Sequence, residues 1–179
     1  LKSQGDYLFF LDSDDYFKKR KIELLIKKFK SNKKFDLIFD LPILKFKNKE
    51  IKKNFKQKKF IISSWPRFTP QSCISLRRDF AKEIFKELKI KKFKTIWFDF
   101  RIAVYYYLKN KNIYIFRKYL TYYRQLDNSA SKEYKFFNKK WWIRRKQAHE
   151  FVSFVNKKLN LKNSNNFDKV ATNIINFFR

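Results

Sequence analysis

The stretch "GDYLFFLDSDDYF", Gly5–Phe17, places three carboxylates directly after an apolar run. Tyr7 to Leu11 is short, continuous and apolar, which predicts a buried strand. Asp12, Asp14 and Asp15 follow in the loop after that strand. Because open α/β sheets bind ligands at the carboxyl ends of their strands, this acidic loop is the first candidate site.

The rest of the chain alternates between strand and helix patterns. In residues 17–30, Ile22, Leu25, Ile26 and Phe29 share one helix face, with lysines opposite. Strands that alternate with helices predict an α/β core, followed here by a helical C-terminal part. We expect helices over 17–30, 77–88, 97–109, 141–159 and 167–178, strands over 35–41 (ending near Pro42), 72–76, 113–116 and 120–124, one or two strands within 43–60, and a polar turn over 125–131.

Lysine dominates the charge of the chain. The 179 residues carry 45 Lys and Arg against 16 Asp and Glu, a net charge of +29, and 44% of residues are hydrophobic, enough for a real core. Such a charge is typical of proteins that bind nucleic acids or membranes. The lysines are spread over every segment, however, and Lys, Asn, Ile, Phe and Tyr all have AT-rich codons. We therefore expect a solvated basic surface and no specific nucleic-acid partner.

Two residue types are rare in a way that bears on function. The chain has one Gly, which excludes a glycine-rich phosphate loop, and no Met. The first predicted strand also begins almost at once. We expect the chain to be the C-terminal portion of a longer protein; the alternative is a complete protein whose initiator Met has been removed. The single Cys73 excludes an internal disulfide.

The three acids have more than one chemical explanation. Carboxylates two residues apart can point at one spot and bind a hard cation such as Mg²⁺ or Mn²⁺, which suits a diphosphate substrate. Asp14 or Asp15 could instead cap the helix that follows. An EF-hand is excluded, because Tyr16 and Phe17 stand where that loop needs glycine.

The acidic stretch closely resembles the D-x-D segment of family 2 glycosyltransferases of the GT-A fold. Two further stretches resemble the same family in the expected order: "SCISLRRDFAKEIF", Ser72–Phe85, and "WFDFRIAVYYYLKNKNIYIFRKYLTYYRQLDNSAS", Trp97–Ser131. The resemblance implies a partial GT-A, three-layer α/β fold with a mixed sheet. Residues 1–131 would be its catalytic half, without the nucleotide-binding half, and residues 132–179 a helical C-terminal extension.

The resemblance also implies a reaction and its residues. An inverting enzyme of this kind transfers a sugar from a nucleotide-diphosphate donor to a hydroxyl of a glycan or lipid-linked acceptor, here in bacterial surface polysaccharide or lipopolysaccharide synthesis. Asp14 would bind Mg²⁺ or Mn²⁺, Asp12 would support the metal or the donor, and Asp99 would be the catalytic base. Asp15 would support the site or cap a helix. As a fragment, the chain is expected to be inactive.

Several positions keep a second explanation. Asp99 could simply favour the first turn of a helix. Arg124 would meet a phosphate or pair with an acid at a strand end, and Trp97 would stack on a sugar or pack in the core. Phe98 and Leu126 depart from the family, which often has Glu and His there. His149 is expected at the surface.

The cellular setting and the competing functions also remain expectations. Trp141, Trp142, Arg144 and Arg145 would either contact an anionic membrane surface or pack in the core with solvated arginines. We expect a cytoplasmic protein, with peripheral contact to the inner face of the membrane as one option. The alternative functions are a basic nucleic-acid-binding module and a D-x-D phosphatase with Asp12 as nucleophile, although Tyr16 replaces the Thr or Val of that family.

Overall fold

The computed structural model describes residues 3–55, 64–88, 92–126, 130–163 and 165–178. The chain forms two compact units, each made of separate segments. The first contains Leu1–Lys56, Arg67–Lys89 and Asn112–Leu126, and the second contains Gln57–Pro66, Ile90–Lys111 and Asp127–Arg179. The boundary near residue 131 that the family resemblance implies stays a prediction.

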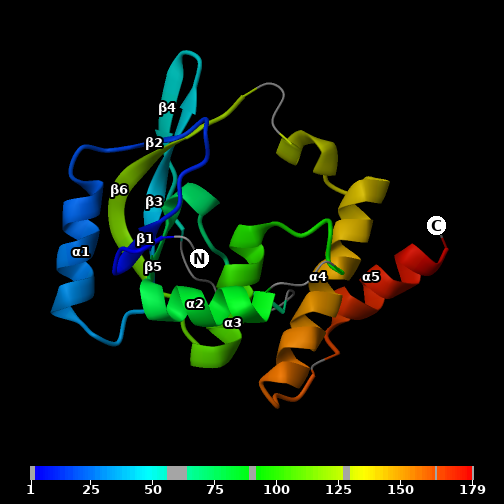
Figure 1. The fold of residues 1–179 in the computed structure, drawn as a ribbon. Coiled ribbons are helices and arrows are strands. Elements are labelled where there is room, and N and C mark those ends of the chain that lie inside the picture. The colour runs from blue at the N-terminus through cyan, green and yellow to red at the C-terminus, as the bar shows by residue number, and fades with distance from the viewer. Residues whose placement is uncertain (1–2, 56–63, 89–91, 127–129, 164, 179) are drawn as a thin grey trace. The chain divides into compact units, whose positions relative to one another are not determined.

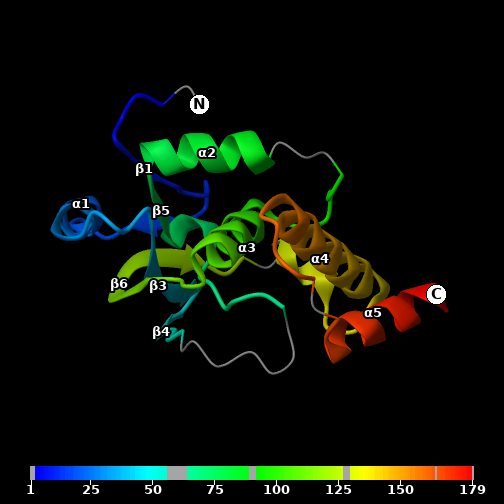
Figure 2. The same ribbon diagram turned by 90° about the horizontal axis from the view of Figure 1, so that it is seen from below.

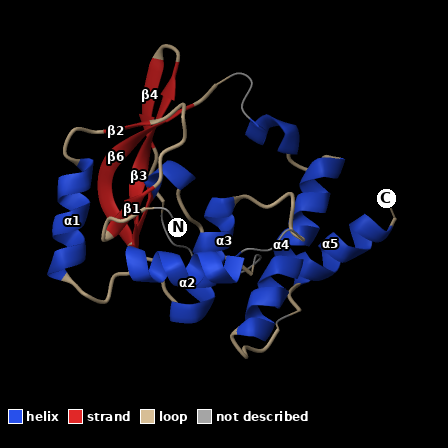
Figure 3. Cartoon of the chain, in the orientation of Figure 1, coloured by secondary structure: helices blue, strands red, loops and turns tan. Residues whose placement is uncertain are grey.

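The first unit is built on a mixed sheet, whose strands are red in Figure 3. The strand order is β1-β5-β3-β6-β2, and β4 pairs with β3. β3 and β6 are parallel, whereas the other described pairs are antiparallel. The α/β core predicted from the alternating pattern is confirmed, and so is the mixed sheet that the family resemblance implies. The strands are β1 (Tyr7–Phe9), β2 (Tyr16–Phe17), β3 (Leu37–Phe46), β4 (Lys49–Lys52), β5 (Ile74–Arg77) and β6 (Ile115–Arg124).

Helix α1 (Lys21–Ser31) lies against one face of this sheet (Figure 1). Leu25 and Phe29 of α1 form a buried cluster with Ile38 of β3 and Leu120 of β6. Full burial of each such side chain contributes about 1.5–3 kcal/mol, so this face supplies much of the stability of the unit. Helix α2 (Arg78–Leu88) packs against β1 and β5, and a short 3-10 helix, η1 (Gln71–Cys73), precedes β5.

The predicted start of the first helix, at residue 17, was wrong. Tyr16 and Phe17 form β2 and pair with Tyr122 and Thr121 of β6. Two ladder positions at the sheet edge replace the first helical turn, and α1 begins only at Lys21. Ile22 is 47% exposed, so it does not belong to the buried helix face as the pattern suggested.

Two strands are longer than the sequence suggested. β3 continues through Pro42 to Phe46, and the register with β6 shifts on both sides of Leu41, so an irregularity accommodates the missing proline N–H. β6 is one continuous strand, where two short ones were predicted. Its pairing with β3 on one side and with β2 on the other explains the continuity.

The second unit is helical. Its helices are α3 (Phe98–Asn110), the 3-10 helix η2 (Ala130–Tyr134), α4 (Lys139–Lys158) and α5 (Phe167–Phe177). Asn138 caps α4 by accepting the Trp141 N–H at 2.7 Å, and Asn166 caps α5 by accepting the Lys169 N–H at 3.0 Å. α3 and α5 both pack against α4, and Figure 2 shows α5 beside it.

Helix α5 turns polar side chains inward. Asp168 and Thr172 are its buried residues, whereas Phe167, Ile174 and Phe177 are 83%, 52% and 83% exposed. The packing of α5 on α4 therefore relies on polar contacts, and an apolar helix face is left at the surface. No helix in the described ranges is long and apolar enough to cross a membrane.

Candidate functional site

The acidic loop joins the two edge strands of the sheet. It leaves β1 at Phe9 and enters β2 at Tyr16, so it passes from one edge of the sheet to the other. The Phe10 N–H donates to the Ile74 carbonyl at 3.3 Å, and the Asp15 N–H donates to the Asp12 carbonyl at 3.0 Å. The second bond closes a tight turn that gathers the three acids.

Asp12 is anchored to η1. Its N–H donates to the Ser72 hydroxyl at 3.0 Å, and its Oδ1 accepts the Gln71 amide at 2.8 Å. Burial raises the pKa of Asp12 above its ordinary value, and the nearby Asp14 raises it further, whereas the hydrogen bond from Gln71 opposes the shift. The Asp12 side chain therefore has a defined position and one carboxylate oxygen already in use.

Asp15 and Arg124 hold the other end of the loop. Asp15 is buried, and its Oδ1 accepts the Arg124 N–H at 2.9 Å. Burial raises the pKa of Asp15, whereas hydrogen bonds from Ser72 and Arg124 lower it. The Arg124 guanidinium donates through Nε to the Asp14 backbone carbonyl. Arg124 therefore fastens the loop to the end of β6, and the structure brings together Asp12, Asp14, Asp15 and Arg124.

Asp14 differs from its two neighbours. Its carboxylate is partly exposed and accepts no hydrogen bond from the residues that the structure describes. In those residues, no three His, Cys, Asp or Glu side chains converge as a preformed metal centre. A hard cation that keeps water and phosphate ligands needs only one or two protein carboxylates. Asp14 and the second oxygen of Asp12 are a donor set that fits such an ion.

A buried ion pair that sequence analysis missed lies next to the loop anchor. Lys21, the first residue of α1, is fully buried, and its Nζ is 2.8 Å from Asp40 Oδ2 on β3. The same ammonium donates to the Ser72 carbonyl and to the Thr121 hydroxyl, both at 2.6 Å, and Thr121 donates to Asp40 Oδ1 at 2.7 Å. This network joins α1, β3 and β6 to the residue that binds the Asp12 N–H.

One pattern could have found Lys21. It lies four residues before Leu25 and eight before Phe29, so it falls on the buried stripe of α1. A lysine at a helix N-terminus is also unfavourable for the helix dipole, which indicates a local partner. The identity of that partner could not be read from the sequence, because Asp40 and Thr121 are distant along the chain.

The other predicted site residues, Asp99 and Trp97, lie in the second unit. Asp99 is in the first turn of α3, and its Oδ1 accepts the Phe100 N–H at 2.7 Å. Trp97 precedes that helix, and its ring lies 6.0 Å from the Tyr134 ring and 3.7 Å from the Arg144 guanidinium. That Asp99 and the acidic loop share one cleft stays a prediction.

The expected surface position of His149 was wrong. His149 is buried, its Nε2 is 3.0 Å from Asp168 Oδ2, and its ring is 4.8 Å from the Trp65 ring. Burial lowers the pKa of His149 to about 4, against the opposing effect of Asp168. Its place three residues before Val152, a member of the apolar face of α4, could have predicted burial. Trp142 is buried too, whereas Trp141 is half-buried.

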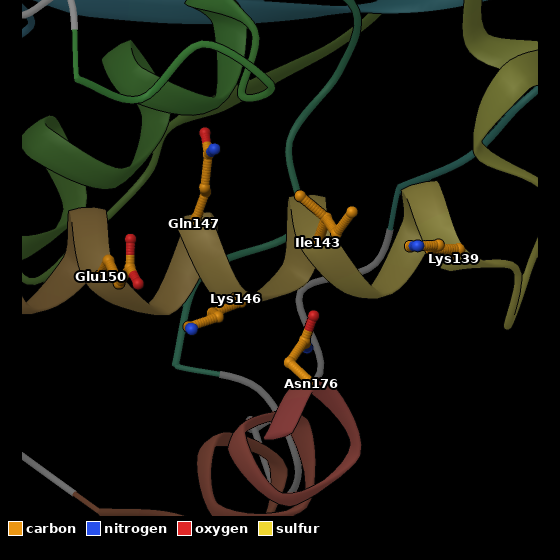
Figure 4. Close-up of a pocket in the computed structure, with 6 residues that line it drawn as sticks. All are labelled: Lys139, Ile143, Lys146, Gln147, Glu150 and Asn176. Atoms are coloured by element: carbon orange, nitrogen blue, oxygen red, sulfur yellow. The ribbon is translucent and has the colours of Figure 1, made fainter. Parts of the chain in front are cut away.

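A hollow of about 370 Å³ between α4 and α5 has a structural explanation. Figure 4 shows its lining along α4 with Asn176 contributed by α5. Gln147 accepts the Thr95 N–H at 3.0 Å, and Asn176 donates to the Trp142 and Thr172 carbonyls at 3.2 and 2.8 Å. These amides hold neighbouring segments together, so we assign no ligand to this hollow.

Comparison with known proteins gives one family match, and most of the matched residues lie in the first unit. Residues 1–85 match the family model described as glycosyl transferase family 2, a range that includes the acidic loop, the Lys21–Asp40 pair and α1. The match supports a family 2 glycosyltransferase-like domain and glycosyltransferase activity in general. Together with the mixed sheet it is consistent with a partial GT-A fold. A search of curated proteins found no match.

Proposed function

We propose that this protein is a metal-dependent, inverting glycosyltransferase that uses a nucleotide-diphosphate sugar. The observation that carries the proposal is the acidic loop at the end of β1, within the residues that match the family model. Four groups from η1 and the end of β6 fix the position of this loop, while the Asp14 carboxylate remains available to a ligand. A rigid loop with an available carboxylate suits recognition of a cation and its diphosphate.

On the donor side, Asp14 and Asp12 would hold Mg²⁺ or Mn²⁺. When bound, the ion would neutralise charge on the departing diphosphate. Gln71 holds the Asp12 carboxylate, Arg124 holds the backbone carbonyl of Asp14, and Asp15 ties the loop to β6. The residues of this chain thus position the donor, and we assign them no proton transfer on this side.

On the acceptor side, Asp99 would be the base. The acceptor oxygen forms a bond to the anomeric carbon while the bond from that carbon to the phosphate oxygen breaks. The acceptor proton passes to the Asp99 carboxylate, and the nucleoside diphosphate leaves with the bonding pair. The first turn of α3 favours the ionised form that a base needs. Trp97 offers a ring face beside it for a sugar.

The proposed acceptor is a glycan or lipid-linked sugar of a bacterial surface polysaccharide or lipopolysaccharide. The exposed apolar face of α5 fits this setting, because Phe167, Phe177 and Phe178 are at least 80% exposed while polar residues face α4. The net charge of +29 complements anionic phospholipids. We therefore assign this face to peripheral contact with an anionic bilayer.

The test is sugar transfer by the full protein, measured as release of nucleoside diphosphate. Asp99→Asn should lower kcat by about 10²–10⁴-fold, the range of general-base catalysis. Asp79→Asn is the matched control, since Asp79 is likewise the second residue of a helix, α2, and its side chain is 99% exposed. A role of Asp99 limited to the helix dipole would make the two variants alike and would refute the assignment.

The donor side is tested by Asp14→Asn, with Asp6→Asn as control because Asp6 is exposed and lies just before β1. Asp14→Asn should raise the Mn²⁺ concentration needed for half-maximal rate by at least about tenfold, whereas Asp6→Asn should leave it unchanged. An unchanged Mn²⁺ requirement in Asp14→Asn would exclude this loop as the metal site.

A further inference from the structure

The second unit contains a pocket that combines aromatic walls with two arginines. Its volume is about 290 Å³. Ile96, Phe100 and Ala148, which are buried, also line it. The side chains that give the pocket its chemistry come from residues 65 and 97, η2 and α4: Trp65, Trp97, Tyr134, Trp141, Arg144 and Arg145. We call this set the tryptophan–arginine pocket.

Arg145 is already neutralised within the unit. Its Nε and its terminal nitrogen are each 2.6 Å from Asp168 Oδ1, and its guanidinium lies 5.2 Å from the Trp65 ring and 4.8 Å from the Trp141 ring. Asp168 also contacts His149 at 3.0 Å. Arg145 therefore braces the two tryptophans and brings no unbalanced charge to the pocket.

Arg144 is in a different state. Its guanidinium lies 3.7 Å from the Trp97 ring centre and 4.7 Å from the Tyr134 ring centre, so both contacts are cation–π contacts. It forms no hydrogen bond or ion pair with any residue in the described part of the chain. Burial lowers the pKa of Arg144, and Asp99 is close enough to raise it. A guanidinium stays charged under such shifts, so among the described residues its donors lack an acceptor.

We propose that the tryptophan–arginine pocket binds an anionic sugar, with the carboxylate or phosphate group of the sugar on Arg144 and its ring against the tryptophans. A guanidinium binds either group through two parallel hydrogen bonds. The volume lies just under the ~300–1,000 Å³ of typical ligand pockets, which fits one sugar ring better than a whole nucleotide. In the proposed reaction this sugar is the acceptor beside Asp99, so the assignment rests on the proposed function.

The experiment measures binding without turnover, by tryptophan fluorescence, for glucuronate, glucose 6-phosphate, glucose and inorganic phosphate. At least one of the two anionic sugars should bind about tenfold or more tightly than both glucose and inorganic phosphate. The tighter of the two identifies the preferred anionic group. If glucose bound as tightly as the anionic sugars, the charge would have no role in binding. If inorganic phosphate bound as tightly, the sugar ring would have none. Either result overturns the proposal.

Three variants locate the binding. Arg144→Gln should weaken binding of the anionic sugar by about 10–100-fold, as expected for loss of a charged, bidentate contact. The affinity for glucose should not change. Arg144→Lys should retain part of the affinity because it keeps the charge. Lys146→Gln removes an exposed charge from the same helix and should change nothing. An equal loss in Lys146→Gln and Arg144→Gln would mean unspecific attraction and would refute the pocket.

The failure of this inference and that of the proposed function are distinguishable. If an anionic sugar binds in an Arg144-dependent way but the protein transfers no sugar, the binding proposal holds and the proposed enzymatic function is refuted. Asp99-dependent transfer that uses neutral and anionic acceptors equally well would support the enzyme and refute the pocket. Circular dichroism of each Arg144 variant establishes that loss of binding is not loss of fold.

Discussion

The buried Lys21–Asp40 pair should be the most sensitive point of the first unit. Lys21→Met keeps the length of the side chain but removes an ammonium with three partners, at 2.8, 2.6 and 2.6 Å. The variant leaves the fully buried Asp40 carboxylate with the Thr121 hydroxyl and the weakly donating Cys73 thiol as donors. Breaking a buried pair in this way costs about 3–5 kcal/mol of unfolding free energy.

A double-mutant cycle isolates the coupling free energy between Lys21 and Asp40 from the other effects of each substitution. Asp40→Asn removes the other charge, and Lys21→Met with Asp40→Asn removes both, so the double variant should be less destabilised than the sum of the single variants by about 2–3 kcal/mol. The pair formed by Lys140 and Glu133 is the control. Its distance, 2.7 Å, is nearly the same, but its side chains are 61% and 59% exposed, so its cycle should show little coupling.

The assay must report on the correct unit. All four tryptophans, at positions 65, 97, 141 and 142, belong to the second unit, so fluorescence does not follow the sheet. Amide hydrogen exchange of β3 and β6 under native conditions measures the opening free energy of the first unit directly. Tryptophan fluorescence follows the control pair, because Glu133 and Lys140 belong to the second unit. A coupling for Lys21 and Asp40 no larger than that of the exposed pair would refute the reasoning.

Three further outcomes follow from the second unit. Because burial lowers the folded pKa of His149 from 6.5 to about 4, the unfolded chain takes up a proton first as pH falls. The free energy of unfolding should be at its full value above pH 6.5 and decline by roughly 3 kcal/mol towards pH 4. Urea unfolding followed by tryptophan fluorescence should show this slope in the wild type and not in His149→Gln; equal slopes would contradict it. Asn138→Ala should lower the unfolding free energy by about 1 kcal/mol and Asn138→Asp should restore it, since only the latter keeps an acceptor for the Trp141 N–H; equal losses in the two variants would exclude a capping role. Phe177→Ser with Phe178→Ser should reduce sedimentation with phosphatidylserine vesicles at least about tenfold, because each Phe buries apolar area worth about 1.5–3 kcal/mol; unchanged sedimentation would remove α5 from the membrane contact.

Local patterns predicted much of the first unit. The apolar run before Asp12 predicted a strand there, and the spacing of Leu25 and Phe29 predicted the buried face of α1. These predictions succeeded because strand and helix periods are short-range properties of the chain. The grouping of the three acids in one loop was also visible in the sequence, since all three lie within four residues. The strand before Asp12 was expected to be buried and to reach Leu11, but β1 ends at Phe9 and is only half-buried, because it is an edge strand.

Patterns failed where a distant partner decided the outcome. Phe17 was expected to begin a helix, but β6, more than a hundred residues later, pairs with it and with Tyr16 in the sheet. His149 was expected at the surface because its neighbours are polar, yet Asp168 and Trp65 surround it. No local signal specified these partners.

By itself, the sequence determined the α/β class, the helical end and the concentration of carboxylates after the first strand. Tertiary structure alone decided which acids have partners. It binds Asp12 to η1 and Asp15 to β6, leaves the Asp14 carboxylate without a donor in the described ranges, and buries Lys21 against Asp40. The physical reason is that a charged group is stabilised by whatever lies a few ångströms away in space, and separation along the chain does not reveal that distance.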